Sequence, residues 1–486
     1  MALRPYDRQG ELLGPSPDSV LAPDHLARVL DELIECIGVG RLNRRYQHTP
    51  GEPAYDVRLL CKVLIYAYAR GITSSREMAR QCVENLAFRF LTSGQCPDHR
   101  TLSRFRRQKR RLLRWVFAQT VRLARGLGLV RLGLVAIDSV KLRADANPSR
   151  KRTAEQLQAD LGKLEAYLAT VENHDQKDDA AHGAAGSGEA LPKKLRSLTR
   201  RRQQLQHALA KLHADQRPSR ASDRAHVRVD VIPTDPDAVW VKKQGKIIPG
   251  YNCHAAVDAE CGVVVAVKPA AEANERDQLN PMIAHVQQTA GAAAQTVVAD
   301  NGYYSDAAIV HAEDGPSRCL VPDGPSAKQL NAGAAVQPPS PYHCENFAYD
   351  EASDTFTCPQ GRKLVVHKEH ERRGLPTTVY AGVDCGSCPV RGDCTADQRG
   401  IRTIEVHREY RKIRQAHERL RSAEGQRLYG RRKAVVEPVF GQWQHNCGVR
   451  RLRLRGLRGC EIELHLLAIG HNAKKFWRKG VRFRER

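Results

Sequence analysis

Two short apolar runs, each carrying an aspartate near its end, limit most strongly what this chain can fold into. LVRLGLVAIDSVKL contains Asp138, and AQTVVAD ends at Asp300. Runs of this length that are rich in β-branched residues are typical of buried strands. A carboxylate at the end of a buried strand is held rigidly beside a natural crevice. Because aspartate is also a common turn former, each of the two is a weak signal by itself.

Further strands and helices can be predicted around these two runs. YNCHAAVDAECGVVVAVKPA predicts a hairpin that turns at residues 258–262. RDQLNPMIAHVQQTA and SDAAIVHAE predict helices, RCLVP predicts a short strand, and the residues from 401 onward are again helical in pattern. With two insertions removed, the order is strand, two strands, helix, strand, helix, strand, helix. This order indicates an α/β core with a mixed five-stranded sheet.

The first 130 residues predict an all-α domain. DVRLLCKVLIYAYARG is a helix that stops at Gly71, and Ser74 with Glu77 forms a capping box for the next helix. Asp98 can cap a further basic helix over residues 98–125. Short helices that end in a basic one fit a DNA reader of the helix-turn-helix kind. An ordinary helical domain with a solvated basic face fits them equally well.

Two insertions interrupt the predicted core. Residues 151–229 carry leucines at alternating spacings of four and three on both sides of the polar stretch 175–192, which predicts an antiparallel helical hairpin. Residues 326–400 are rich in cysteine. The core is therefore expected in residues 131–150 and 230–325, and residues 401–486 complete it with late helices and a basic tail. The leucine pattern comprises Leu157, Leu161, Leu164, Leu168, Val171, Leu191, Leu195, Leu198, Leu205, Leu209 and Leu212.

Charge and composition point to nucleic acid as the partner. The net charge is +24, and residues 401–486 hold 23 Lys and Arg against 8 Asp and Glu. Such a surface favours a phosphate-rich partner, although a basic protein that binds RNA nonspecifically shares the feature. The sequence contains neither a signal peptide nor an apolar run long enough to span a membrane, so we expect a cytoplasmic protein. In that compartment the 14 cysteines are better interpreted as thiols or metal ligands than as disulfides.

A third carboxylate, Glu437, lies in the basic C-terminal region. Its neighbours Val436, Val439, Phe440 and Trp443 form an apolar helical stripe, which would leave Glu437 on the flank facing the crevice. Pro438 disfavours helical geometry at Glu437, so the helix is expected to kink or begin there.

Three carboxylates that converge from separate elements suffice to hold the Mg²⁺ or Mn²⁺ ions of phosphodiester chemistry. We therefore predict that Asp138, Asp300 and Glu437 form a catalytic metal site. Three other carboxylates compete for this role. Asp258 is expected to belong to the hairpin turn, Asp145 lies far beyond the first strand, and Asp277 is the third.

Four segments carry a specific resemblance, namely IDSVKLRADA, TDPDAVWVKKQGKIIPGYNCHAAVDAE, VVADNGYYSD and VVEPVFGQWQHNCGVRRLRLRGL. In these segments the chain resembles bacterial insertion-sequence transposases of the DDE type, which have an RNase H-like core behind a helical domain. The resemblance implies that Asp138, Asp300 and Glu437 are the catalytic triad. It also implies metal-assisted cleavage at transposon ends, followed by attack of the 3′-hydroxyl on target DNA.

The chain departs from the family at one position. Related transposases often carry a Lys seven residues after the Glu, where this chain has Gln444. A Tyr-x-x-Arg signature is present as Tyr429 and Arg432, one residue further from the Glu than usual. Arg450, Arg451 or Arg453 could supply the missing cation. The predicted DNA-binding residues are Arg104, Arg107, Arg432, Arg450 and Arg453.

The cysteine-rich segment contains a second set of candidate metal ligands. Cys358 lies in TCPQG, Cys385 and Cys388 form CGSCP, and Cys394 follows. Two thiolates of a C-x-x-C pair with two others can complete a tetrahedral Zn²⁺ site, and the resemblance supports these four residues. Cys344 is a fifth candidate. Reduced structural thiols or a redox pair are the alternatives to a structural zinc ion.

The predicted function is that of a DNA transposase acting on double-stranded terminal inverted repeats and target DNA. It is expected to act as a homodimer, because two transposon ends must be held together. A nuclease without strand transfer and a noncatalytic DNA-binding protein derived from a transposase are the alternatives.

Overall fold

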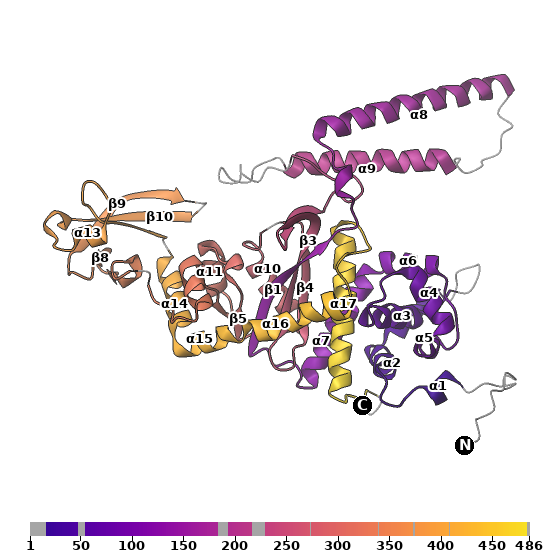
Figure 1. Ribbon diagram of the computed structural model, residues 1–486, viewed down its shortest axis with the longest axis horizontal. Helices are drawn as coiled ribbons and strands as arrows, with labels where there is room; N and C mark the ends of the chain where they lie inside the picture. The colour runs from indigo at the N-terminus through magenta and orange to yellow at the C-terminus, as the bar shows by residue number, and fades with distance from the viewer. Residues whose placement is uncertain are drawn as a thin grey trace, which may run out of the picture.

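The chain forms a central body from which two smaller units project, as a computed structural model shows (Figure 1). The structure describes residues 16–46, 54–182, 193–215, 229–272, 274–338, 340–372, 375–407 and 409–483. In the central body a mixed sheet lies beside a group of helices, while a helical hairpin and a second sheet extend away from it. No helix in these described ranges has both the length and the apolar character needed to cross a bilayer.

The N-terminal region is helical, and its helices begin at predicted capping residues. Ser74 accepts a hydrogen bond from the backbone N–H of Glu77 at 3.5 Å, and Asp98 accepts one from Thr101 at 2.5 Å. The third helix ends before Gly71, whose φ of 80° favours glycine. The elements are α1 (Pro17–Val20), α2 (Leu26–Ile37), the 3₁₀ segment η1 (Val39–Tyr46), α3 (Val57–Ala69), α4 (Ser75–Glu84), α5 (Leu86–Leu91), α6 (His99–Gln108) and α7 (Arg110–Gly126).

The prediction of one continuous helix over residues 98–125 is wrong. The backbone leaves helical geometry at Lys109, with φ −98° and ψ 33°, and this break separates α6 from α7. The two helices bury their apolar faces against different neighbours: α6 packs on α3 and α4, whereas α7 packs on the late helix α17 (Gly456–Arg478). The break at Lys109 lets α6 pack mainly on α4 while α7 packs mainly on α17.

The central sheet has six strands in a mixed arrangement. Its order is β2-β3-β1-β5-β6, and β4 pairs with the edge of β3 that also carries β2. Strand β3 runs antiparallel to its neighbours, whereas β1, β5 and β6 are parallel. The strands are β1 (Leu134–Arg143), β2 (Val239–Lys243), β3 (Lys246–Asp258), β4 (Val264–Ala270), β5 (Thr296–Val298) and β6 (Arg318–Leu320).

Four of these features were predicted and one was missed. The hairpin of β3 and β4 and the strands β1, β5 and β6 are confirmed, which supports the predicted α/β core. The predicted number of five strands is wrong because β2 extends the sheet. This strand is short and half-exposed, with only Val241 buried, so its sequence lacks the apolar run of a central strand.

Helices cover the sheet and complete its core. Helices α10 and α17 pack on β4, whereas α16 packs on β1 and β3 (Figure 1). The elements that follow the sheet strands are the 3₁₀ turns η2 (Pro148–Arg150) and η4 (Asn301–Tyr303), the helices α10 (Leu279–Ala290), α11 (Asp306–Glu313), α12 (Gly324–Asn331), α14 (Tyr410–Arg421), α15 (Ala423–Gly430) and α16 (Arg432–Gly441), and the π-helical turn η7 (Gln442–Asn446).

Helix α17 joins the N-terminal helices to the sheet. It contacts α2, α3 and α7 on one side and β4 on the other, and residues 462–473 are all buried. Asp235 and Asp237 of the TDPD segment accept hydrogen bonds from the first backbone N–H groups of the helix, those of Gly456 and Leu457, at 3.0 and 2.9 Å. One hydrophobic core therefore runs from Leu21 to Phe483.

The predicted helical hairpin is present as α8 (Ala154–His182) and α9 (Lys193–Asp215), which lie antiparallel (Figure 1). Leu157, Leu161, Leu205 and Leu212 form its own small core. Helix α8 runs to His182, so the predicted polar loop at 175–192 begins too early. The side chains of Val171, Leu191 and Leu195, which belong to the predicted pattern, lie outside the described residues.

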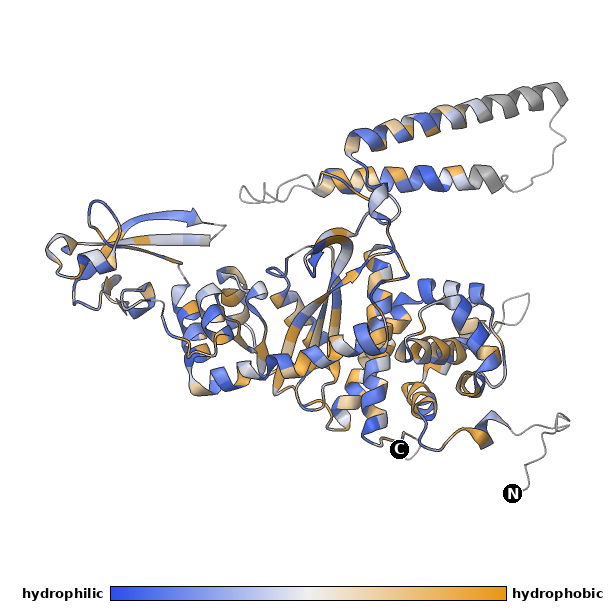
Figure 2. Ribbon diagram, in the orientation of Figure 1, coloured by the Kyte–Doolittle hydropathy of each residue, from blue (hydrophilic) through white to orange (hydrophobic). Residues whose placement is uncertain are grey.

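The cysteine-rich segment forms a second, antiparallel sheet in the order β11-β10-β9-β8-β7. Its core consists of Phe347, Phe356, Leu364, Tyr380, Ile404 and Val406. Figure 2 shows the contrast with the central sheet, since β9 is hydrophilic along most of its length. The elements are the 3₁₀ turns η5 (Cys344–Asn346) and η6 (Cys385–Ser387), the helix α13 (Arg391–Cys394), and the strands β7 (Ala348–Asp350), β8 (Thr355–Thr357), β9 (Lys363–Arg372), β10 (Leu375–Gly382) and β11 (Thr403–His407).

Candidate active site and nucleic-acid interface

Asp138 of β1 and Asp300 after β5 lie at the same level of the central sheet. Ala136 of β1 is paired with Val298 of β5 in a parallel register. Asp138 and Asp300 each follow two residues later, so both return to the same face at the same height. The structure therefore brings these two predicted residues together. The prediction that Asp138 ends its strand is wrong, because β1 continues to Arg143 through its pairing with β3, whereas Asp300 does follow the end of β5.

Arg432 neutralises part of this site. Its guanidinium donates from Nη1 to Oδ2 of Asp138 at 2.6 Å, and the exposed fractions of the two side chains are 10% and 19%. The same guanidinium lies 5.9 Å from the ring centre of Tyr429. Arg432 was predicted to contact DNA, but it is buried and paired with a carboxylate of the protein. Its position on α16 nevertheless anchors that helix to the site.

A further carboxylate, Glu275, enters the site from the loop between β4 and α10. The Ser139 hydroxyl donates to its Oε1, and the Asn252 amide donates to the same oxygen at 3.5 Å. Sequence reasoning missed Glu275 because it lies in the irregular segment AEANERDQ, where Asp277 was considered instead. We call Asp138, Asp300, Glu275 and Arg432 the carboxylate centre.

The electrostatics of the carboxylate centre favour proton or cation uptake. Burial, together with the charges of Glu275 and Asp138, raises the pKa of Asp300 from 3.8 to about 6. Burial also raises the pKa of Asp138, although the Arg432 guanidinium opposes this effect. One guanidinium thus faces three carboxylates. Hard oxygen donors with excess negative charge fit Mg²⁺ or Mn²⁺.

Glu437 lies on the same helix as Arg432 but is exposed. The predicted apolar stripe is confirmed, because Val436, Val439 and Trp443 are buried beside it. Pro438 lies inside α16, and the helix continues into η7, where Cys447 N–H bonds to Gln442 at i−5. Among the described contacts, none joins Glu437 to Asp138 or Asp300.

No three carboxylate, imidazole or thiol side chains within the described ranges already stand in a metal-holding arrangement. The structure thus brings together two members of the predicted triad and leaves the third on the flank of α16.

The competing carboxylates have other partners. Asp258 accepts backbone N–H bonds from Leu132 and Glu260 at 2.8 and 3.0 Å, which supports its predicted place in the hairpin turn. Asp145 pairs with Arg451 and Arg455 at 2.5 and 3.0 Å. Asp277 is exposed.

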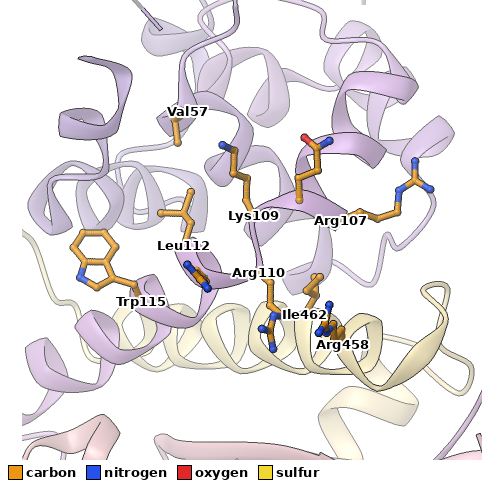
Figure 3. A pocket seen from close by; sticks show the side chains of 10 residues that line it. Val57, Arg107, Lys109, Arg110, Leu112, Trp115, Arg458 and Ile462 are labelled. Carbon is orange, nitrogen blue, oxygen red and sulfur yellow. The ribbon is translucent and has the colours of Figure 1, made fainter. Parts of the chain in front are cut away.

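A basic groove lies at the junction of α6 and α7, where these helices face α17. It has a volume of about 720 Å³ and holds an exposed indole among cationic side chains (Figure 3). Trp115, which is 39% exposed, lies at one end, and Arg107 lies at the other. The residues that line the groove are Val57, Arg107, Gln108, Lys109, Arg110, Arg111, Leu112, Trp115, Arg458 and Ile462.

The basic residues around this groove fall into two groups. Arg110 and Arg114 pair with Glu461, and the buried Arg106 donates to the Tyr68 hydroxyl at 2.9 Å, so these three arginines hold the fold together. Arg104 and Arg107 are exposed on α6.

Two more of the predicted DNA-binding residues, Arg450 and Arg453, are exposed in the segment between η7 and α17. Gln444, which stands where relatives often have a Lys, is half-buried in η7. The exposed cations Arg450 and Arg453 therefore lie in the segment before α17, whereas relatives often carry a Lys on the helix of the Glu.

Four cysteines border one small cavity in the second sheet. Cys358, Cys385, Cys388 and Cys394 line a space of about 20 Å³, and we call them the thiol cluster. Burial and the other three cysteines raise the pKa of the Cys394 thiol. The Arg362 N–H donates to the sulfur of Cys358 at 3.3 Å within a tight turn. The fifth candidate, Cys344, packs against the small apolar core of this sheet.

Comparison with known families gives the chain its context. Residues 357–477 match the family described as "Transposase DDE domain", and residues 16–108 match "Transposase domain (DUF772)". Both matched models describe transposase domains. This confirms the resemblance to insertion-sequence DDE transposases. The first match includes Glu437 and the thiol cluster, whereas Asp138 and Asp300 lie outside both matched regions. Neither a curated protein nor a solved structure matches the chain.

Proposed function

We propose that this transposase cleaves the ends of an insertion sequence and joins the freed 3′-hydroxyl to target DNA by two-metal chemistry. The observation that carries the proposal is that Asp138 and Asp300 lie two residues beyond the paired Ala136 and Val298 of parallel strands, with α16 packed on β1. An RNase H-like core is part of this proposal. The strand order β4-β3-β1-β5-β6, with β3 alone antiparallel among these five, supports it.

The residues of the carboxylate centre fit divalent cations. When bound, Mg²⁺ or Mn²⁺ would activate the attacking oxygen and stabilise the leaving one. Asp138 would hold the ions from within β1 and Asp300 from the turn after β5, and Glu437 would join them from α16. Arg432 competes with a cation for Asp138, because its guanidinium already occupies Oδ2 of that carboxylate. We infer that Arg432 holds Asp138 in place before a cation arrives.

DNA would bind along the basic surface of the N-terminal helices and the segment before α17. Arg104, Arg107, Arg450 and Arg453 are exposed there and would contact phosphates. Within the basic groove, Trp115 offers a stacking surface for an unpaired base, and Arg107 and Arg458 line the opposite end of the same groove. A homodimer on DNA would hold the two ends together.

A structural Zn²⁺ ion is proposed for the thiol cluster. Four cysteines around one cavity supply the ligand number and the sulfur donors that Zn²⁺ prefers. The ion would hold together a sheet whose own core is small.

The test uses purified protein, Mg²⁺ and DNA that carries the terminal repeats of its own locus. Asp138→Asn, Asp300→Asn and Glu437→Gln are compared with the wild-type chain. We expect each variant to lose cutting at the repeat ends while DNA binding remains, and we expect joined products from the wild type alone.

Two observations favour a noncatalytic DNA-binding protein as the second candidate. Glu437 is exposed beside the site rather than within it, and Gln444 replaces the usual Lys. Tight binding of the repeat DNA without any cutting by the wild type would support this second candidate. Cutting without joining would identify a nuclease.

A further inference from the structure

Glu275 is the least expected member of the carboxylate centre. It is separated from its hydrogen-bond partner Ser139 by 136 positions in the chain, and the partner directly follows Asp138 on β1. Its carboxylate also borders Asp300. A methyl group added at Gly302 would collide with Oε2 of Glu275 and would lie 3.1 Å from Oδ1 of Asp300. Glu275 therefore lies near both aspartates, through Ser139 on one side and the Gly302 turn on the other.

A role in holding the loop does not explain why this residue carries a charge. Ser139 and Asn252 both donate to Oε1, and the amide oxygen of a glutamine could accept the same two hydrogen bonds. The guanidinium of Arg432 is bound to Asp138 rather than to Glu275. A third negative charge beside two aspartates is unfavourable unless a cation balances it. The hydrogen bonds that hold the loop therefore do not require a carboxylate at position 275.

We propose that Glu275 supplies a fourth carboxylate to the divalent-cation site formed by Asp138, Asp300 and Glu437. Its Oε1 is oriented by Ser139 and Asn252, which leaves Oε2 directed towards Asp300 and the turn at Gly302. Oriented carboxylates of this kind are how proteins fix a cation in one position. The inference rests on the proposed function, because it assumes that the carboxylate centre binds divalent cations.

A substitution at Gly302 provides an independent way to displace the Glu275 carboxylate. Because a methyl group at Gly302 would collide with Oε2 of Glu275, Gly302→Ala would push the carboxylate out of position without changing any charge. The φ of Gly302 is not positive, so alanine is compatible with the backbone there.

The experiment measures Mn²⁺ binding to the full-length protein without DNA by titration calorimetry, and end cleavage in parallel. Glu275→Gln keeps the shape and both accepted hydrogen bonds but removes the charge. We expect its Mn²⁺ affinity to fall at least about tenfold, with a comparable loss of cleavage. Gly302→Ala should show a similar but smaller loss of Mn²⁺ affinity. The matched control is Glu272→Gln, which makes the same chemical change in the same loop at an exposed position.

The outcomes separate this inference from the proposed function. If Asp138→Asn and Asp300→Asn abolish Mn²⁺ binding while Glu275→Gln binds as the wild type does, the role of Glu275 is refuted and the proposed function stands. If neither aspartate variant changes binding or cleavage, the proposed function fails and the inference fails with it. Equal loss in Glu275→Gln and Glu272→Gln would also refute a specific role, since it would reflect the charge of the loop alone.

Discussion

The carboxylate centre and the thiol cluster are both sets of metal-type side chains, but they are supported in opposite ways. The carboxylate centre is mounted on strands of the large core that runs from Leu21 to Phe483. The thiol cluster lies in turns of a sheet whose apolar core consists of six residues. The first has its own internal cation in Arg432, whereas the second consists of four cysteines around a very small cavity.

This difference indicates what a metal ion would do at each place. A large core fixes Asp138 and Asp300 whether or not an ion is bound, so an ion there would serve chemistry. Six apolar side chains stabilise a sheet only weakly, so an ion at the thiol cluster serves folding. The four predictions below test this contrast, and they are ordered by the size of the expected effect.

Removal of metal from the thiol cluster should have the largest effect. Binding of structural zinc contributes roughly 10 kcal/mol in small domains. We therefore expect a chelator, or Cys388→Ser, to unfold the sheet of β7 to β11 while the central sheet stays folded. Hydrogen exchange followed by peptide mass spectrometry would measure both regions in one sample. Cys261→Ser, at a partly buried cysteine outside the cluster, is the control. If the amides of the central sheet exchanged at the same time, the contrast between the two regions would be contradicted.

Removal of the internal cation should have the next largest effect. Arg432→Met leaves Asp138 largely buried without its partner, which should lower the free energy of unfolding by about 3 kcal/mol. Mn²⁺ should restore part of this loss. The control is Arg414→Met in an exposed ion pair with Glu418, which should cost less than about 1 kcal/mol. Denaturant titrations measure both. Equal losses in the free energy of unfolding of the two variants would show that Asp138 needs no cation.

Neutralisation of the second aspartate should stabilise the protein. The pKa of Asp300 is about 6 in the folded protein and 3.8 when unfolded, so between these values the folded state binds more protons. Stability therefore falls as the pH rises through this window. We expect Asp300→Asn to raise the free energy of unfolding by about 2 kcal/mol at pH 7, and to change nothing below pH 3.8. Denaturant titrations at both pH values, without divalent cations, measure these free energies. A lower free energy of unfolding for Asp300→Asn at pH 7 would contradict the prediction.

The smallest effect is expected in the basic groove, which contains neither the carboxylate centre nor the thiol cluster. Trp115→Ala should weaken binding of single-stranded DNA by about 1 to 2 kcal/mol, because one stacked base is lost. The melting temperature should not change, since the indole is 39% exposed. Trp477→Ala removes an indole of nearly equal exposure, 40%, outside the groove. Fluorescence anisotropy with labelled DNA measures the affinities, and equal losses in both variants would eliminate a specific stacking site.

Much of the fold could be predicted because it depends on local patterns. Leucines at alternating spacings of four and three predict α8 and α9, and apolar runs predict β1 and β5. The meeting of Asp138 and Asp300 was also predicted, although the extent of β1 beyond Asp138 was not, because the polar residues Ser139 and Lys141 interrupt the apolar run there.

The remaining features depend on tertiary contacts that no local pattern records. Glu275 lies in an irregular loop and reaches the site only through the packing of that loop on β1. The break at Lys109 follows from two helices that need different neighbours. The burial of Arg432 was unpredictable because an arginine beside Tyr429 suits a phosphate contact and an internal ion pair equally well.

Helix α17 has a consequence for synthesis of the chain. The Tyr68 hydroxyl donates to Glu463 across 395 positions, and the helix lies between the first helices and the sheet. The N-terminal helices emerge from the ribosome long before their partner exists, and they carry an exposed apolar face until then. Contacts of such long range also slow folding. A ribosome that stalls before residue 456 therefore releases a chain in which neither the N-terminal helices nor the central sheet has the helix that joins them.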